Sequence, residues 1–186
     1  AQTSANVAAR LNFTDGIYSN QLSVTLNLLH HEILSNNGPL TSGDIFVLLQ
    51  EQFAPYMRTG PGSNLPRGGI AHLFTGRNFS SGFVGLAFIG VLCSTNFGYG
   101  VDQDFNGNTL SALVFAHELG HNFSAPHDGE EACASESFRG IMNPFINGSS
   151  EFSNCSIQQM SDDIAAASCL TDVFINEEIH LDGFEN

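Results

Sequence analysis

The sequence contains no lysine. Its 186 residues carry five basic side chains, all of them arginine, against 19 acidic ones, and the formal net charge at pH 7 is −14. An acidic surface of this kind repels nucleic acid and anionic membranes, so we expect neither as a partner. The charge either serves solubility, which is the stronger interpretation, or favours cationic peptide substrates.

Long apolar runs are also absent. No run approaches the roughly 20 residues that a membrane-spanning helix needs, so we expect no membrane span. The chain starts at Ala1 without methionine and shows no signal peptide, which indicates a processed or trimmed form of something longer. Its length and its 42% hydrophobic content suit one globular domain with its own core.

Two sequence motifs are missing as well. Without a C-x-x-C pair, a zinc site built from cysteines is disfavoured, and without G-x-S-x-G there is no sign of a serine hydrolase elbow. An even number of cysteines in an acidic, processed chain indicates two disulfides and an oxidising compartment, so we expect a secreted protein. Spacing alone permits three pairings of the four cysteines, Cys93, Cys133, Cys155 and Cys169.

What the chain does contain is an H-E-x-x-H motif. His117 and His121 are four residues apart and share one face of a helix, so both can bind one metal ion. Glu118 lies one position round and can reach a metal-bound water. The helix cannot pass Pro126, and His127 then returns as a third ligand. Three imidazoles leave the fourth zinc position open for water, as in catalytic sites.

Two surface histidines on a helix are the simpler alternative. Against it, residues 110–116 are strongly apolar, so the histidines follow a buried stem. A third histidine and the later run Gly-Ile-Met-Asn-Pro at 140–144 also argue against coincidence. This arrangement resembles the metzincin pattern, H-E-x-x-H-x-x-G-x-x-H followed by a Met-turn. Asp128 after the third histidine, together with residues 85–90 and 152–156, resembles the adamalysin/reprolysin branch, the ADAM-type proteases.

The resemblance covers roughly residues 5–170 and implies an α+β metzincin fold. Its α/β-type upper subdomain would hold a twisted, mostly parallel sheet with an antiparallel edge strand, and the active-site helix. We place this upper subdomain at about 1–127 and a small irregular lower one at about 128–170, which together make the catalytic domain 1–170. Residues 171–186 would form a C-terminal tail.

The resemblance also implies the site. His117, His121 and His127 would bind one Zn²⁺, Glu118 would be the general base, and Met142 would lie beneath the metal without binding it. The implied function is a secreted zinc endopeptidase that hydrolyses peptide bonds with a zinc-activated water. We expect a monomer whose partners are a protein or peptide substrate and an inhibitory propeptide. The alternative is an inactive metzincin-fold binding module, disfavoured because the three histidines and the glutamate all remain.

The same resemblance implies a disulfide pairing and substrate contacts. It favours Cys93–Cys169 and Cys133–Cys155. Residues 83–93 would be the edge strand, which offers free backbone groups to an extended peptide at Gly85, Leu86 and Ala87. An ordinary core strand is the plainer interpretation, and both can hold. The S1′ pocket would be walled by residues after the Met-turn, Pro144, Phe145 and Ile146.

One residue departs from the family pattern. Ser124 stands where the family has glycine, at a position where helices commonly end in a left-handed residue. Serine there costs about 1 kcal/mol, which we interpret as tolerated strain.

Calcium is a weaker prediction. Residues 102–107 resemble the start of a calcium loop, but Leu113 stands where such a loop needs glutamate. A turn into the active-site helix, with Asn108 or Thr109 as N-cap, is the stronger interpretation.

The remaining pattern predicts a set of elements in chain order. They are a helix over 4–18, a strand over 21–34, a helix capped by Asp44 and running through Tyr56, strands at 70–74 and from 98 onward, and a last helix from a Ser156–Gln159 capping box to Cys169. Adamalysin-like domains open with a further strand inside the sheet. We expect it upstream of Ala1, and we expect residues 173–186 to be peripheral to the sheet.

Overall fold

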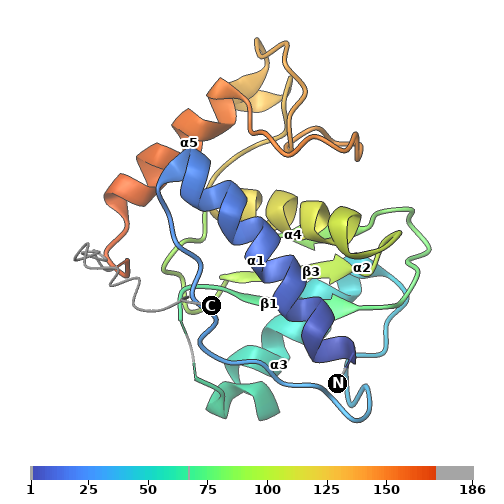
Figure 1. Cartoon of the computed structure of the whole chain (residues 1–186). Helices are drawn as coiled ribbons and strands as arrows, with labels where there is room; N and C mark the ends of the chain where they lie inside the picture. Colours follow the sequence, from blue (N-terminus) through green and yellow to red (C-terminus); the bar gives the residue numbers. More distant parts are fainter. Residues whose placement is uncertain (1, 67, 171–186) are drawn as a thin grey trace, which may run out of the picture.

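The computed structural model describes residues 2–66 and 68–170. The expectation for the C-terminal tail lies outside these residues. The described part is α+β, as predicted (Figure 1). Its elements are α1 (Gln2–Leu22), α2 (Ile45–Val47), the π-helical turn η1 (Leu48–Phe53), α3 (Ala54–Arg58), the 3-10 turn η2 (Pro61–Asn64), β1 (Ala71–Thr75), β2 (Gly85–Ala87), β3 (Tyr99–Gln103), α4 (Asn108–Asn122), the 3-10 turn η3 (Glu131–Cys133) and α5 (Asn154–Ala166).

The sheet has three strands in the order β1-β3-β2. β1 runs parallel to β3, and β2 pairs with β3 antiparallel at the edge. The predicted antiparallel edge strand is therefore present, but the sheet is mixed rather than mostly parallel, since it has one pair of each kind. β2 is also much shorter than the predicted strand over 83–93. After Phe88 the chain leaves the sheet, and the N–H groups of Gly90 and Val91 bond to α4 carbonyls instead.

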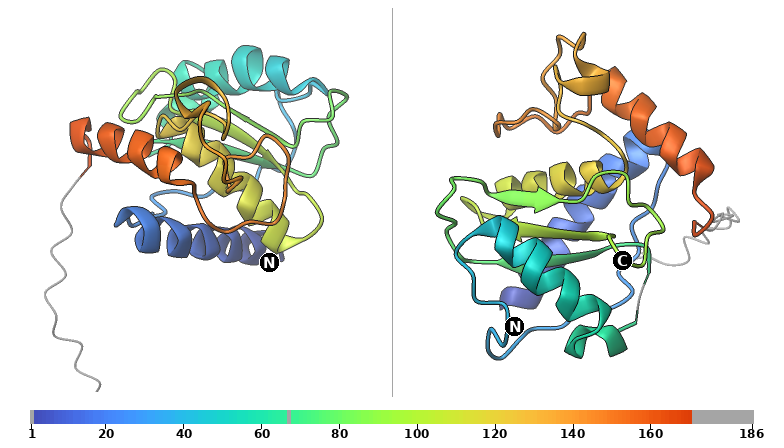
Figure 2. Two further views of the ribbon diagram at one scale, coloured as in Figure 1. Left: turned by 90° about the horizontal axis from the view of Figure 1, so that it is seen from above. Right: turned by 180° about the vertical axis from the view of Figure 1, so that it is seen from behind.

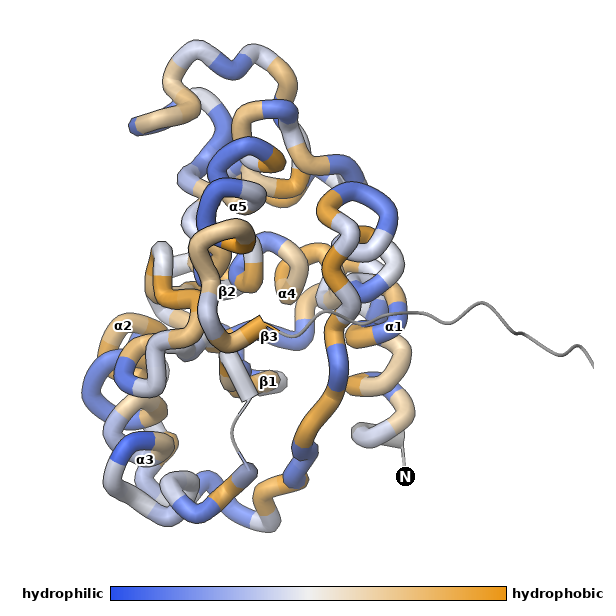
Figure 3. The backbone as a smooth tube through the Cα atoms, turned by 90° about the vertical axis from the view of Figure 1, so that its left-hand side faces the viewer, coloured by the Kyte–Doolittle hydropathy of each residue, from blue (hydrophilic) through white to orange (hydrophobic). Residues whose placement is uncertain are grey.

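Two hydrophobic cores lie on opposite faces of the sheet. On one face α4 packs with α1 and α5, around Tyr18, Leu119 and Met160. On the other, η1 and its neighbours pack on Tyr99 and Val101 of β3. Figures 2 and 3 show this layering, with α1 and α3 on opposite sides of the strands. Because successive strand residues face opposite sides, Gly100 and Asp102 face α4.

The helix predicted from Asp44 is present. The Asp44 carboxylate accepts hydrogen bonds from the N–H groups of Phe46 (2.8 Å) and Val47 (3.2 Å), as an N-cap should. Helical turns then continue to Arg58, although the middle of the run is π-helical.

The strand predicted over residues 21–34 is wrong. α1 extends to Leu22, and no strand follows before α2 in the described residues. The alternating leucines predicted a pleat, but a strand also needs a neighbour to accept its backbone bonds. β1 pairs only with β3 in the part of the chain that the structure describes. Leu28 and Leu29 are consequently more than half exposed, at 53% and 60%.

Two helix starts also differ from the prediction. α4 begins at Asn108 with Gly107 before it, and neither Asn108 nor Thr109 is its N-cap. α5 is capped by Ser153, whose hydroxyl accepts from the Ser156 N–H at 3.1 Å, and it ends at Ala166. At α5 more than one serine could serve as the cap, and the path of the preceding chain selects Ser153, whereas α4 has no side-chain cap.

Two disulfides join distant segments. Cys93 pairs with Cys169 (Cα–Cα 5.4 Å), and Cys133 pairs with Cys155 (5.7 Å), which is the pairing that the family resemblance implies. The first links the segment after β2 to the segment after α5. The second fastens η3 to α5.

Removing the long-range disulfide should cost more stability than removing the short-range one. The sequence separations are 76 and 22 residues, and loop-closure entropy then predicts losses of about 4 and about 3 kcal/mol. We expect this order in urea unfolding of the paired variants C93S/C169S and C133S/C155S. Recovery of a Cys93–Cys133 peptide from a non-reducing digest would contradict the pairing itself.

Candidate metal and catalytic site

The three predicted histidines come together at the end of α4. One ring nitrogen from each of His117, His121 and His127 lies within 4.8 Å of the others. The chain reverses between the second and third through Ser124, whose φ is +75°, and the Ala125 N–H bonds back to the Gly120 carbonyl (3.0 Å). The left-handed conformation expected at Ser124 is therefore confirmed, and it is the turn that returns the chain to the helix.

The histidine rings are held from behind by their Nδ1 atoms. His117 Nδ1 donates to the Ile141 carbonyl at 2.7 Å, and His121 Nδ1 donates to the Ala125 carbonyl at 2.8 Å. His127 Nδ1 lies 3.2 Å from the Glu130 carboxylate. Partners of this kind select the tautomer that leaves Nε2 free for a metal ion. The donor set fits a three-histidine metal centre with an open position.

The protonation state of the two helix histidines also suits a metal. The pKa of His117 is lowered to about 4 and that of His121 to about 3, mainly by burial and in part by the charges of the neighbouring imidazoles. Both rings are therefore neutral at pH 7, which is the form that binds a metal.

The Glu118 side chain extends from α4 and is buried against the edge strand β2. It is 5% exposed, and its carboxyl lies directly over Gly85, where a Cβ atom would overlap it. Gly85 is paired with Asp102 in the sheet register. Burial raises the pKa of Glu118 well above its usual range, and the charge of Asp102 raises it further. The carboxyl thus lies between the histidine helix and the strand predicted to bind substrate.

Gly85→Ala should disturb this carboxyl. The added Cβ has no room unless the Glu118 side chain moves, so we expect any peptidase activity to fall by at least about tenfold while the fold is kept. Gly76→Ala is the matched control, because no atom lies within 4 Å of a Cβ there. Equal activity of both variants would show that the position of Glu118 over Gly85 is unimportant.

The Met-turn and Asp128 close the site from below. Met142 is fully buried. Its sulfur packs closely against Gly120, and a Cβ atom added to that glycine would lie only 2.6 Å from the sulfur. Asp128 accepts bonds from the Gly140 N–H (2.7 Å) and the Ser153 hydroxyl (2.6 Å), and so fastens the turn to the start of α5. The sequence marked Asp128 only as a family feature; these two contacts depend on residues that follow it by 12 and 25 positions.

A small pocket opens beside His117. Its volume is about 20 Å³, and it is lined by Leu113, His117, Ile141, Asn143, Ile146, Asn147, Gly148 and Ser149. Of the three predicted wall residues only Ile146 lines it. Pro144 is exposed and Phe145 is 78% exposed, because the loop turns outward there and returns through 147–149. A larger groove of about 610 Å³ between α1 and residues 150–157 includes none of the predicted site residues.

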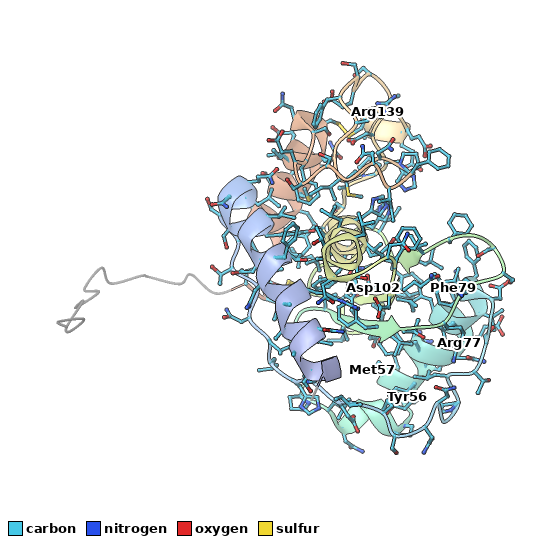
Figure 4. The ribbon with its side chains drawn as sticks, turned by 45° about the vertical axis from the view of Figure 1, so that its right-hand side comes forward. Tyr56, Met57, Arg77, Phe79, Asp102 and Arg139 are labelled. Carbon is cyan, nitrogen blue, oxygen red and sulfur yellow. A yellow bond between two sulfur atoms is a disulfide. The ribbon has the colours of Figure 1, made fainter. Side chains whose placement is uncertain are left out.

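The sequence missed a buried network under α4. His72 lacks metal-ligand spacing in the sequence, yet its side chain is only 5% exposed and bonds to Asp102 (2.6 Å) and Asn122 (2.9 Å). Figure 4 shows Asp102 beneath α4, seen end-on. The one available sign of this network was Asp102, a carboxylate on β3, whose residues are all buried.

This network also gives the carboxylates of residues 102–107 other partners. Asp102 binds His72, and Asp104 forms an ion pair with Arg10 at 2.7 Å. The carboxylates that resembled a calcium loop therefore point to different partners. Residues 105–107 instead turn into α4, as the stronger interpretation held.

None of the helices in the described ranges has the length and apolar character that crossing a membrane requires.

Comparison with known proteins agrees with the geometry. A reprolysin family model, described as Metallo-peptidase family M12, matches residues 1–156. One similar protein is the disintegrin and metalloproteinase domain-containing protein adm-2 of Caenorhabditis elegans, 36% identical over 93 residues. That match covers 48% of this chain and 10% of the relative. The family resemblance drawn from the sequence is confirmed: the chain belongs to metallo-peptidase family M12, with a reprolysin-type, ADAM-like catalytic domain.

Proposed function

We propose that this chain is an active zinc endopeptidase with a metzincin fold. The observation that carries the proposal is the convergence of His117, His121 and His127 beside a buried glutamate. Three imidazoles with an open fourth position are the donor set of catalytic zinc sites. Bound zinc would supply a water of lowered pKa and would polarise the scissile carbonyl.

Glu118 is the general base of this proposal. Its carboxyl would accept a proton from the attacking water and then deliver that proton to the leaving amine. Burial raises the pKa of Glu118 above its usual range, a direction that favours its later role as a proton donor. Met142 would support the histidine cluster from below without binding the metal.

The edge strand would align the substrate. β2 bonds to β3 on one side, and in the described part of the chain no strand pairs with its other side. An extended peptide can add there as a further antiparallel or parallel strand, bonding to Gly85–Ala87. The side chain after the scissile bond would then enter the pocket beside His117, with Ile146 as one wall.

The wider setting is also part of the proposal. Two disulfides support an extracellular location. We assign the catalytic domain to residues 1–170, divided near Asp128, and expect a monomer acting on proteins or peptides, with an inhibitory propeptide as a regulatory partner. The family supports protein substrates.

A labelled-peptide or casein assay tests the activity. We expect cleavage that a chelator abolishes and that added Zn²⁺ restores. An inactive binding module, the second candidate, predicts no cleavage with full metal occupancy. Metal analysis of the same sample separates that outcome from a protein that has simply lost its ion.

A further inference from the structure

A buried histidine outside the metal cluster has both ring nitrogens engaged. His72 Nδ1 lies 2.6 Å from Asp102 Oδ2, and Nε2 lies 2.9 Å from Asn122 Oδ1. The ring lies over Gly100, its register partner on β3, where a Cβ would overlap it, and Phe115 packs edge-on at 5.0 Å between ring centroids. The ring is thus enclosed by sheet and helix and cannot turn away.

The orientation of Asn122 determines which atom of His72 carries a proton. Asn122 Nδ2 faces two carbonyl oxygens, those of Phe88 (2.8 Å) and Tyr99 (3.2 Å), so it must be the amide NH₂. Its oxygen therefore faces His72 Nε2, which must donate. Carbonyl oxygens accept only, so the reverse assignment would set the Asn122 oxygen against two other acceptors and leave it without a donor.

The second ring nitrogen then carries a proton as well. The short contact to Asp102 holds one proton, and imidazole is far more basic than a carboxylate, so the proton resides on Nδ1. Burial alone would lower the pKa of His72, but the charge and hydrogen bond of Asp102 and the bond to Asn122 outweigh it and raise the pKa. Asp102 and, beyond it, Glu118 are the charged groups facing this site.

The His72–Asp102 pair also explains how one buried carboxylate oxygen is tolerated without a hydrogen bond. Asp102 is fully buried, and its Oδ1 has no hydrogen-bond partner. An uncompensated carboxylate there would be strongly destabilising. A positive charge on His72 supplies the compensation that the missing hydrogen bond does not.

Asn122 connects the His72–Asp102 pair to the segment that follows the edge strand β2. Asn122 is the last residue of α4, and its amide holds the carbonyl of Phe88, the residue that follows β2. Two backbone bonds continue the same junction, from Gly90 N–H to the His121 carbonyl and from Val91 N–H to the Asn122 carbonyl, both at 3.0 Å. Residues 88–91, which we call the junction segment, are thereby tied to the end of the metal-binding helix.

We propose that His72 is a positioning residue: as a buried imidazolium paired with Asp102, it holds Asn122 in the orientation that ties the junction segment to α4. This tie then fixes the position of the edge strand β2 relative to the histidine cluster. The consequence for peptide binding rests on the proposed function, whereas the charge state of His72 and the tie to α4 do not.

Nitrogen-15 NMR of the metal-loaded protein tests the charge. We expect both ring nitrogens of His72 to carry hydrogen at pH 7.5, with the resonance assigned by its loss in His72→Gln. In Asp102→Asn a neutral ring can still donate to Asn122 and accept from the new amide, so only one N–H should remain. A single N–H in the unaltered protein, or two in Asp102→Asn, would overturn the proposal.

Hydrogen exchange and kinetics test the positioning. In His72→Gln the amides of Gly90 and Val91 should lose roughly 10- to 100-fold protection, the effect of a lost hydrogen bond to a charged group. Asp102→Asn leaves a neutral ring that can still donate to Asn122, so protection should fall by less than in His72→Gln, and His30→Gln, at an exposed histidine, should match the unaltered protein. Unchanged protection in His72→Gln would refute the tie.

For an extended peptide, His72→Gln should raise KM about tenfold with kcat within about threefold and unchanged bound metal. A fall in kcat alone would refute the role in peptide alignment. If the unaltered protein cleaves nothing, the proposed function fails while the NMR and exchange results still decide this inference.

Discussion

Glu118→Gln is expected to lose peptide hydrolysis by roughly 10²- to 10⁴-fold, the usual contribution of a general base. The replacement has almost the same size, so it fits the space over Gly85. It cannot accept the proton of the attacking water. Glu118 is not among the three clustered ligand residues, so zinc content should remain at one ion per chain. Activity is measured on a labelled peptide and metal by elemental analysis of the same preparation.

Two further variants sharpen this result. Glu118→Ala should lose activity to a similar extent, again with zinc retained, and an empty site in either variant would show that Glu118 is a ligand. Glu32→Gln changes an exposed glutamate and should leave both activity and metal unaltered.

His127→Ala should lose most of the metal affinity. Its ring is the third donor, and it is contributed by the loop after α4 rather than by the rigid helix. Two imidazoles hold the ion less well than three. The loss should exceed the roughly 10- to 100-fold that removing an outer partner of a ligand costs. Competition with a chromophoric chelator gives the affinity directly, without relying on activity.

Glu130→Gln provides the graded comparison. Its carboxylate lies 3.2 Å from His127 Nδ1 and orients the ring without being one of the clustered ligands, so its loss should fall within that smaller range. His31→Ala, at an exposed histidine, should bind metal as the unaltered chain does. Equal losses for the 127 and 130 variants would show that His127 is not a ligand.

The sequence predicted local structure correctly where one residue type determines it. Asp44 before an apolar periodic run capped its helix as predicted, and the left-handed turn at Ser124 lay where the motif required it. The strand predicted over 21–34 was wrong for the opposite reason. Alternation describes a surface that suits a sheet, but the backbone bonds come from a neighbour, and none pairs with it among the described residues.

The pocket shows the same limit. Ile146 lines it as predicted, but Pro144 and Phe145 do not, because the outward turn of their loop depends on contacts made elsewhere. Asn147, for example, donates to the Arg139 carbonyl at 2.8 Å, eight residues back along the chain. No spacing rule within the loop could indicate which side chains it turns inward.

By itself the sequence determined the family and the candidate ligand set, because both depend on residues within one helix and the turn that follows it. Helical geometry brings positions 117 and 121 to one face, and a proline and a left-handed serine return position 127. Only the tertiary structure decided what surrounds them. His72, Asp102 and Asn122 belong to β1, β3 and α4 and meet through a register of strands and the packing of a helix. Such a meeting depends on the whole fold, so the buried pair and its link to the segment after β2 cannot be inferred from residue order.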